Sequence, residues 1–238
     1  MVKYTGDRTR FVVRITTPNG RLPQYTPPTD GNFYSLILSE GNGKYTIELY
    51  EGTAGTTSVV ALDKLELNVS IANANTPFLM PNYYVDFTAS SSIIQKGSEV
   101  TAGKKTEIDK ISAIYNWFVE NVKYDDHRAA TVQSGYVPNL SDLMRDKKGI
   151  CFDYAAGMAA MLRSHGIPTK MVHGDANDIF HAWIITYSTE TGLINGWIRF
   201  DGKSWTLMEP TWAAANGDDN KGFREFVSGG NHTAKLYF

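Results

Sequence analysis

The feature that most constrains the fold of this chain is a change in the spacing of its apolar residues near Lys96–Thr106. Before it, apolar and polar residues alternate, most clearly over Leu65–Ile71, as they do in half-buried strands. After it, apolar residues recur at the helical period over Ile111–Val122. Because the two patterns occupy separate segments, the sequence predicts an α+β protein in two parts, residues 1–95 and 96–238.

Residues 1–95 are expected to form a β-rich domain. Besides Leu65–Ile71, strands are predicted at Phe11–Ile15, Phe33–Leu38, Tyr45–Tyr50 and Val59–Leu62. The Gly- and Asn-rich loop after Phe33–Leu38 predicts that this strand forms a hairpin with Tyr45–Tyr50. Short strands joined by Gly, Pro and Asn turns favour a small sandwich or an open sheet.

Residues 96–238 are expected to place helices first and strands afterwards. The helices are predicted at Thr106–Val122, with Thr106 as the N-cap, at Ser141–Arg145, with Ser141 as the cap, and at Cys151–Ser164. The strands are predicted at Thr169–Val172, His181–Tyr187, Trp197–Phe200 and Trp205–Met208. This order favours helices packed on an antiparallel sheet.

Composition excludes several classes of protein. The 238 residues are 42% hydrophobic and 20% charged, which is typical of globular chains and not of disordered ones. A formal net charge of -2 gives no long-range attraction for nucleic acid or for an anionic membrane. No apolar run approaches the roughly 18 residues of a membrane helix. The polar N-terminus has no signal-peptide core, so we expect a cytosolic protein or a mature secreted one with an added Met1.

The chain has one cysteine, which excludes an intramolecular disulfide, a Cys-based zinc site and a CxxC redox motif. Cys151 follows Gly149 at the start of a predicted helix. Free N–H groups and the positive end of the helix dipole at such a position favour a nucleophilic thiolate. The alternative is a small buried side chain, which is a common place for a free cysteine.

A thiolate nucleophile needs a base, and His181 is the candidate because it begins a predicted strand directly after a polar loop. The other histidines lie in a charged segment, at a helix end, at a strand end and in the C-terminal tail, namely His127, His165, His173 and His232. The carboxylate that orients such a base could be Glu209, at a strand end, or Asp201, at a predicted turn.

Four segments in order resemble the transglutaminase-like core, the fold shared by transglutaminases, some bacterial and archaeal cysteine proteases and peptide N-glycanases. They are Ile114–Val119 with Val122–Asp125, Gly149–Ala155, Met161–Lys170, and His181–Trp183 with Glu209–Trp212. The resemblance covers residues 111–212 and implies a papain-like cysteine protease core.

The resemblance assigns roles residue by residue. Cys151 matches the family's nucleophile and His181 its general base. Glu209 stands where the family usually has the Asp of an Asp-Pro-Thr motif, and its side chain is one methylene longer. Trp183 and Trp212 are expected to line the cleft. The Cys151 backbone N–H is the first expected oxyanion donor, and the second could come from Tyr124, Trp117 or Tyr136, each of which could instead be a packing aromatic.

The implied activity is thiol-dependent acyl transfer or hydrolysis at carboxamide or peptide bonds of proteins or peptides, without a cofactor. Two other classes of protein are alternatives to this activity. A catalytically weak or inactive surface binding module remains the alternative, whereas a metal enzyme is disfavoured because the sequence has no HExxH motif or paired-His spacing. The chain also resembles exported proteins of Gram-positive bacteria, which implies an extracellular or cell-surface location and cell-wall or surface-protein partners, with a cytoplasmic location as the alternative.

Overall fold

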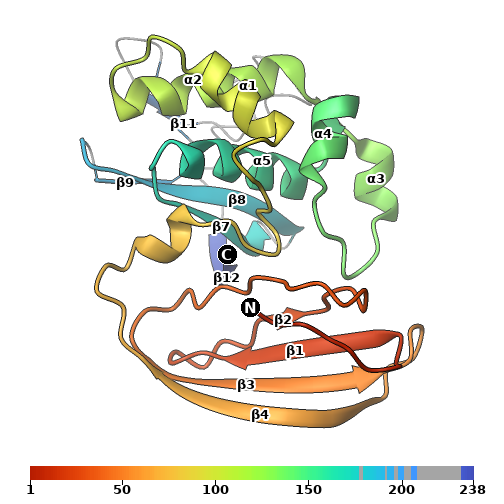
Figure 1. Ribbon diagram of the computed structural model, residues 1–238. Helices are drawn as coiled ribbons and strands as arrows, with labels where there is room; N and C mark the ends of the chain where they lie inside the picture. The colour runs from red at the N-terminus through yellow and green to blue at the C-terminus, as the bar shows by residue number, and fades with distance from the viewer. Residues whose placement is uncertain (177–178, 191, 196–197, 201–204, 208–231) are drawn as a thin grey trace. The chain divides into compact units, whose positions relative to one another are not determined.

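A computed structural model describes residues 1–176, 179–190, 192–195, 198–200, 205–207 and 232–238. Contacts divide the chain into two compact units, Met1–Pro77 and Phe78–Phe238. The first unit is built from strands, and the second combines helices with a sheet, so the predicted α+β class is confirmed (Figure 1).

The first unit is a single antiparallel sheet in the order β2-β1-β3-β4. Its strands are β1 (Arg10–Thr16), β2 (Gln24–Tyr25), β3 (Gly43–Gly52) and β4 (Val59–Val69). Alternate residues of β1, among them Val13 and Ile15, are buried together with Tyr25 and Tyr45. The sequence predicted two strands where β4 runs without a break, because a bulge opposite Leu49 and Tyr50 absorbs the irregular spacing.

The predicted hairpin between Phe33–Leu38 and Tyr45–Tyr50 is wrong. The second segment is the middle of β3, but its partners are β1 and β4, which occupy both edges of β3. No edge of β3 is left for the Phe33 segment, in which only Tyr34 forms an isolated bridge, to Val2. Turn-forming residues after a run of apolar residues therefore did not determine which strands pair.

The second unit begins with helices α1 (Ser92–Val100), α2 (Glu107–Asn121), α3 (Asp126–Thr131), α4 (Leu140–Asp146) and α5 (Cys151–Ser164), after a short 3-10 turn at Thr76–Leu79. Thr106 caps α2 as predicted, because its side chain accepts a hydrogen bond from the Asp109 N–H. The cap of α4 is Asn139 and not Ser141, since the Asn139 side chain accepts from the backbone N–H groups of the next turn.

The strands of the second unit form an antiparallel sheet in the order β12-β7-β8-β9. Their bounds are β7 (Thr169–Ala176), β8 (Ile179–Ser188), β9 (Gly192–Asn195) and β12 (His232–Tyr237). Separately from this sheet, β10 (Ile198–Phe200) and β11 (Trp205–Leu207) pair antiparallel with each other. The antiparallel sheet predicted from the sequence is confirmed, and β12 was not predicted.

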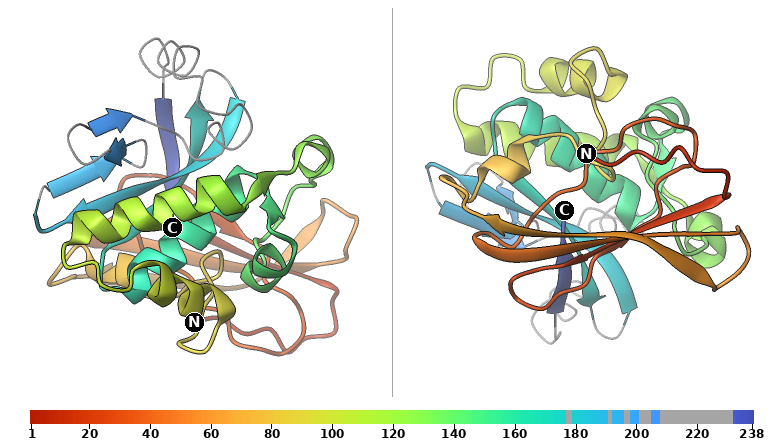
Figure 2. Two further views of the ribbon diagram at one scale, coloured as in Figure 1. Left: turned by 90° about the horizontal axis from the view of Figure 1, so that it is seen from above. Right: turned by 60° about the horizontal axis from the view of Figure 1, so that its bottom comes forward.

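Helix α5 lies between the sheet and the other helices of its unit (Figures 1 and 2). It is buried around its whole circumference, from Phe152 to Arg163. Small residues let its neighbours approach closely. A Cβ on Gly157 would lie 2.7 Å from the Phe118 ring of α2 and 2.9 Å from Leu143 of α4. The helix that begins with Cys151 is therefore fixed on all sides by its packing.

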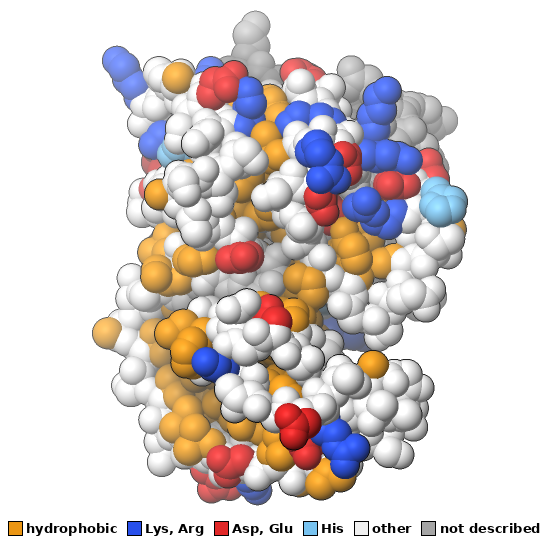
Figure 3. Space-filling view, turned by 45° about the vertical axis from the view of Figure 1, so that its right-hand side comes forward, with side chains coloured by type: hydrophobic (Ala, Val, Ile, Leu, Met, Phe, Trp, Pro, Cys, Tyr) orange, Lys and Arg blue, Asp and Glu red, His pale blue; other side chains and the backbone are white. Residues whose placement is uncertain are grey.

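Charged side chains of both signs are mixed on the face that carries α3 and α4 (Figure 3). Arg145, for example, pairs with Asp142 and Asp146 of its own helix. Among the described residues, no helix is both long and apolar enough to cross a membrane. Nor do the described residues include a group of three or more His, Cys, Asp or Glu side chains that could hold a metal ion.

Candidate active site

Cys151 is the first residue of α5 and is half-buried. The residue before it, Ile150, has an extended backbone and occupies the N-cap position, where an isoleucine side chain has no atom that can accept a hydrogen bond. The first helical hydrogen bond runs from the Tyr154 N–H to the Ile150 carbonyl, at 3.1 Å. Cys151 therefore lies at the N-terminus of the helix, which is the positive end of the helix dipole and carries unpaired N–H groups.

The segment before Cys151 is held by a short parallel pair of strands, β5 (Lys123–Tyr124) and β6 (Lys148–Gly149). The Lys123 N–H donates to the Lys147 carbonyl and the Asp125 N–H to the Gly149 carbonyl, both at 2.9 Å. Gly149 is required here, because a Cβ at this position would lie 2.7 Å from the Cβ of Asp153. The backbone that leads into the cysteine is thus fixed on both sides.

The carboxylate of Asp153, only 1% exposed, supplies the second half of a capping box, in which the third helical residue binds the backbone of the N-cap residue. Its Oδ2 accepts from the Ile150 N–H at 2.9 Å, and its Oδ1 accepts from the Tyr136 hydroxyl at 2.6 Å. Arg128 Nη1 lies 3.5 Å from Oδ2. Burial raises the pKa of Asp153, although the hydrogen bonds from Tyr136 and Ile150 and the charge of Arg128 oppose the rise.

A second carboxylate, Asp125, supports the same region from the N-cap of α3. It accepts from the Arg128 N–H at 3.0 Å, and Lys148 Nζ lies 3.0 Å from its Oδ1. The hydrogen bonds from Arg128 and Lys148 lower the pKa of Asp125. Arg128 therefore lies between two carboxylates, Asp125 and Asp153, with its side chain also 3.2 Å from the Tyr136 hydroxyl.

His181 is the third residue of β8, is half-buried, and pairs across the sheet with Gly174 of β7. Trp183 lies two residues further along β8 and so projects from the same face as His181. A Cβ on Gly174 would lie 2.7 Å from the Trp183 ring, so the indole packs directly over that glycine. The predicted base and one predicted cleft residue thus share one face of the sheet.

One contact relates the start of α5 to this part of the sheet. The ring of Phe152, the residue after Cys151, lies 4.3 Å from the ring of His173, centroid to centroid. His173 precedes Gly174, the partner of His181, in β7. Because neighbouring residues of a strand project from opposite faces, the His173 ring that Phe152 contacts lies on the face of the sheet opposite to that of His181.

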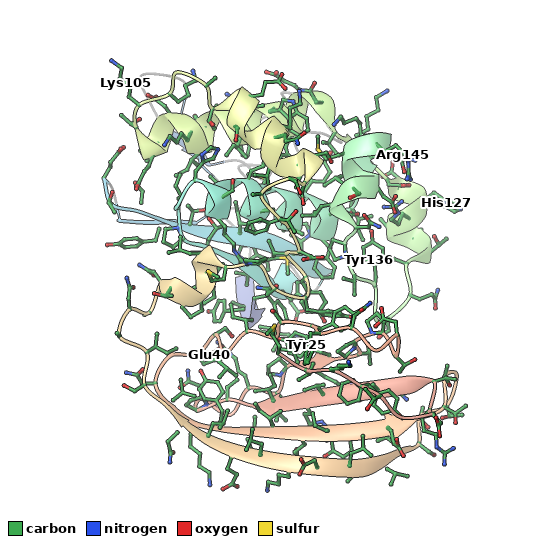
Figure 4. The ribbon with its side chains drawn as sticks, viewed as in Figure 1. Tyr25, Glu40, Lys105, His127, Tyr136 and Arg145 are labelled. Carbon is green, nitrogen blue, oxygen red and sulfur yellow. The ribbon has the colours of Figure 1, made fainter. Side chains whose placement is uncertain are left out.

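The other four histidines differ from His181 in their position or surroundings. His173 is 6% exposed, and burial lowers its pKa to about 4, so its imidazole is neutral at physiological pH. His165 lies with Nε2 3.0 Å from the Thr101 hydroxyl at the end of α5. His127 is exposed on α3 and points away from the unit (Figure 4), and the backbone of His232 belongs to β12.

The remaining predicted residues have different surroundings. Tyr124 pairs with Gly149, two residues before the cysteine, through the backbone. Trp117 packs edge-on against Phe118, and Lys147 Nζ lies 4.8 Å from its ring centroid. Tyr136 lies on the inner side of the segment that joins α3 to α4 (Figure 4), with its hydroxyl hydrogen donated to Asp153. Glu209, Asp201 and Trp212 lie outside the described residues.

Sequence reasoning missed Asp153 and Arg128. A signal for Asp153 was present, because an acidic residue three positions after an N-cap is the second half of a capping box. It was hidden because the cap itself is Ile150 and not Ser or Thr. Nothing in the local sequence indicates that Arg128 would meet a carboxylate 25 residues further along.

Comparison with known proteins gives a family for the second unit. Residues 94–208 match the transglutaminase-like superfamily. Human kyphoscoliosis peptidase is 24% identical over 132 residues, which are 56% of this chain and 20% of that protein, so the match spans about a fifth of the relative.

Two solved structures are also similar. A candidate cysteine protease from Cytophaga hutchinsonii aligns over 97% of this chain and 84% of its own at 13% identity, with a TM-score of 0.43. The periplasmic domain of TgpA from Pseudomonas aeruginosa aligns over 88% of this chain and 92% of its own at 15% identity, with a TM-score of 0.42.

Proposed function

Because residues 94–208 belong to the transglutaminase-like superfamily, we propose that this chain carries out thiol-dependent acyl transfer with Cys151 as the nucleophile. The observation that carries the proposal is the position of the chain's one cysteine: half-buried, first in α5, with the preceding backbone held by β5 and Asp153. A purely structural cysteine needs neither a helix N-terminus nor access to solvent.

The proposed reaction has two steps. The Cys151 thiolate attacks the carbonyl carbon of a carboxamide or peptide bond, a C–S bond forms, and the carbonyl electrons move to oxygen. When the tetrahedral intermediate collapses, the C–N bond breaks and the leaving amine takes a proton from the His181 imidazolium. Water or a second amine then attacks the thioester, gives its proton to His181 and releases the thiolate.

The remaining roles follow from the same proposal. His181 is the general base and acid, and Glu209 is the carboxylate that orients its imidazole. The Cys151 N–H is one oxyanion donor. Tyr124 is the better candidate for the second, because its backbone is paired two residues from the cysteine, whereas the Tyr136 hydroxyl is engaged by Asp153. Trp183 and Trp212 line the cleft.

The partners are proteins or peptides, and the first screen should separate hydrolysis from transfer. Casein, glutamine peptides with a primary-amine donor, and cell-wall peptides would each be incubated with the chain, and release of ammonia, new termini and amine incorporation would be measured. Amine incorporation identifies transfer, and new termini identify proteolysis. We expect Cys151→Ser and His181→Gln to abolish either product.

A positive screen in which Cys151→Ser keeps its activity would contradict the proposal. Failure of every substrate, combined with ordinary reactivity of the thiol, would favour the binding module instead. An extracellular or cell-surface location remains part of the proposal, supported by the Thr-, Asn-, Tyr- and Gly-rich first unit. Fractionation of cells that produce the full-length protein would test it, and recovery only from the cytoplasm would contradict it.

A further inference from the structure

We propose that Asp153, held by Tyr136 and Arg128, is a positioning residue for Cys151. Its carboxylate fixes the backbone of Ile150 and Cys151, so that the thiolate and the Cys151 N–H keep one orientation toward the acyl group. The inference rests on the proposed function, because it concerns how the nucleophile of that reaction is held.

The geometry gives Asp153 a specific task. It belongs to the first turn of the helix that Cys151 begins, and its side chain reaches back to the N–H immediately before the cysteine, at 2.9 Å. Because Ile150 offers no side-chain cap, this contact is the only side-chain bond to the N-cap backbone among the described residues. Without it, the peptide between Gly149 and Ile150, which lies one peptide before Cys151, would keep only the hydrogen bond from the Asp125 N–H to the Gly149 carbonyl.

The position of the carboxylate is in turn set by groups outside α5. The Tyr136 hydroxyl donates to Oδ1 at 2.6 Å, and Arg128 lies 3.5 Å from Oδ2. Tyr136 comes from the mostly exposed segment of residues 132–139, and Arg128 comes from α3. A carboxylate with this little exposure is costly to bury unless it is paired. Two segments outside α5 therefore converge on this one buried side chain.

The inference predicts that substitutions of Tyr136 or Asp153 change the rate of Cys151 acylation more than the rate of its alkylation. Alkylation by iodoacetamide needs only a thiolate, whereas acylation by p-nitrophenyl acetate also needs the thiolate and the oxyanion donor in one geometry. We expect Tyr136→Phe to lower the acylation rate about tenfold, and Asp153→Ala about 100-fold, since a displacement of about 1 Å can cost that much. The alkylation rate should change less than threefold.

Asp153→Asn supplies the conservative comparison. Its amide oxygen can still accept from the Ile150 N–H, so acylation should recover to a level between those of Asp153→Ala and the unmodified chain. The controls are Asp126→Asn, which removes an exposed carboxylate from α3, and Tyr187→Phe, which removes an exposed hydroxyl from β8. Both should keep the original ratio of acylation to alkylation.

The possible outcomes separate this inference from the proposed function. If the unmodified chain is not acylated at Cys151, the proposed function fails and the inference falls with it. If it is acylated and both Tyr136→Phe and Asp153→Ala keep the ratio, only the inference is overturned. A Tyr136→Phe chain that does not fold, or that loses acylation and alkylation equally, would also overturn it, because the network would then serve the fold and not the nucleophile.

Discussion

Burial fixes the charge state of individual side chains in the second unit, and His173 shows the consequence most clearly. Its folded pKa of about 4 lies below the ordinary value of 6.5, because the charged form is desolvated. The unfolded chain therefore binds a proton at a higher pH than the folded chain does. The stability that the neutral ring contributes is complete above pH 6.5 and is lost as the pH falls toward 4.

As the pH is lowered from 7 to 4.5, we expect the free energy of unfolding to fall by about 2 to 3 kcal/mol because of His173 alone. Urea unfolding of His173→Gln should show a correspondingly weaker pH dependence, whatever its absolute stability. His127→Gln, which changes an exposed histidine, should keep the original dependence. Identical pH dependence in His173→Gln and the unmodified chain would show that His173 is not the source of this loss.

Glu209 provides the second prediction for a single residue. As the orienting carboxylate, it should hold the His181 tautomer and stabilise the imidazolium beside the thiolate. We expect Glu209→Gln to lower turnover of p-nitrophenyl acetate by about two to four orders of magnitude, by analogy with loss of an orienting carboxylate. Asp201→Asn should lower this turnover only slightly. The reverse pattern would assign the role to Asp201.

The packing of elements around α5 depends on glycine at one helix crossing. Gly157 has the ring of Phe118 and the side chain of Leu143 within 3 Å of where a Cβ would lie. We expect Gly157→Ala to destabilise the unit by about 1 to 3 kcal/mol, the usual cost of overpacking a core. Measurement by urea unfolding would check this.

Gly97 of α1 is the matched control. A Cβ there would lie 3.1 Å from Met161 Cγ and 3.3 Å from Met161 Cβ, which is a looser fit than at Gly157. Gly97→Ala should therefore cost less stability than Gly157→Ala, helped by the better helix propensity of alanine. Equal losses in the two variants would mean that the crossing at Gly157 is not tightly packed.

Elements with strong local signals were predicted from the sequence, and elements defined by distant partners were not. The Thr106 cap and the apolar period identified α2, and Gly166 marked the end of α5. The pairing of β3 depends on residues far away in the chain, so the local turn signal predicted the wrong partner. The same holds for the candidate site. Cys151 begins α5 as predicted, but His181 is the third residue of β8 and not its first, and the contact of Asp153 with Tyr136 joins separate segments.

At the scale of the whole molecule, the two units are separated at Pro77, before the change in apolar period that the sequence shows near Lys96. That they are independent domains remains a proposal. The stretch between β4 and α1 contains the exposed residues Ala72–Ala74. Elastase cuts after small residues. Of all its cuts within residues 1–176, we expect the first to fall at Ala72–Ala74, because exposed chain outside regular elements is cleaved most readily.

Replacing both alanines, Ala72→Pro and Ala74→Pro, should slow that cut and leave the others unchanged. Mass spectrometry of the early fragments would identify the site. If cleavage in this range begins instead within α1, at Ser92–Val100, the helix is not a stable part of the second unit, and the proposed separation of the domains would have to move.

The central claim is that Cys151 is a nucleophile activated together with His181. The most direct test is the rate of Cys151 alkylation by iodoacetamide at pH 6 relative to pH 9. An ordinary thiol, with a pKa of about 8.5, slows about 200-fold over this range. We expect the unmodified chain to slow less than tenfold and His181→Gln to approach the ordinary ratio. A 200-fold loss in the unmodified chain, unchanged by His181→Gln, would contradict the account.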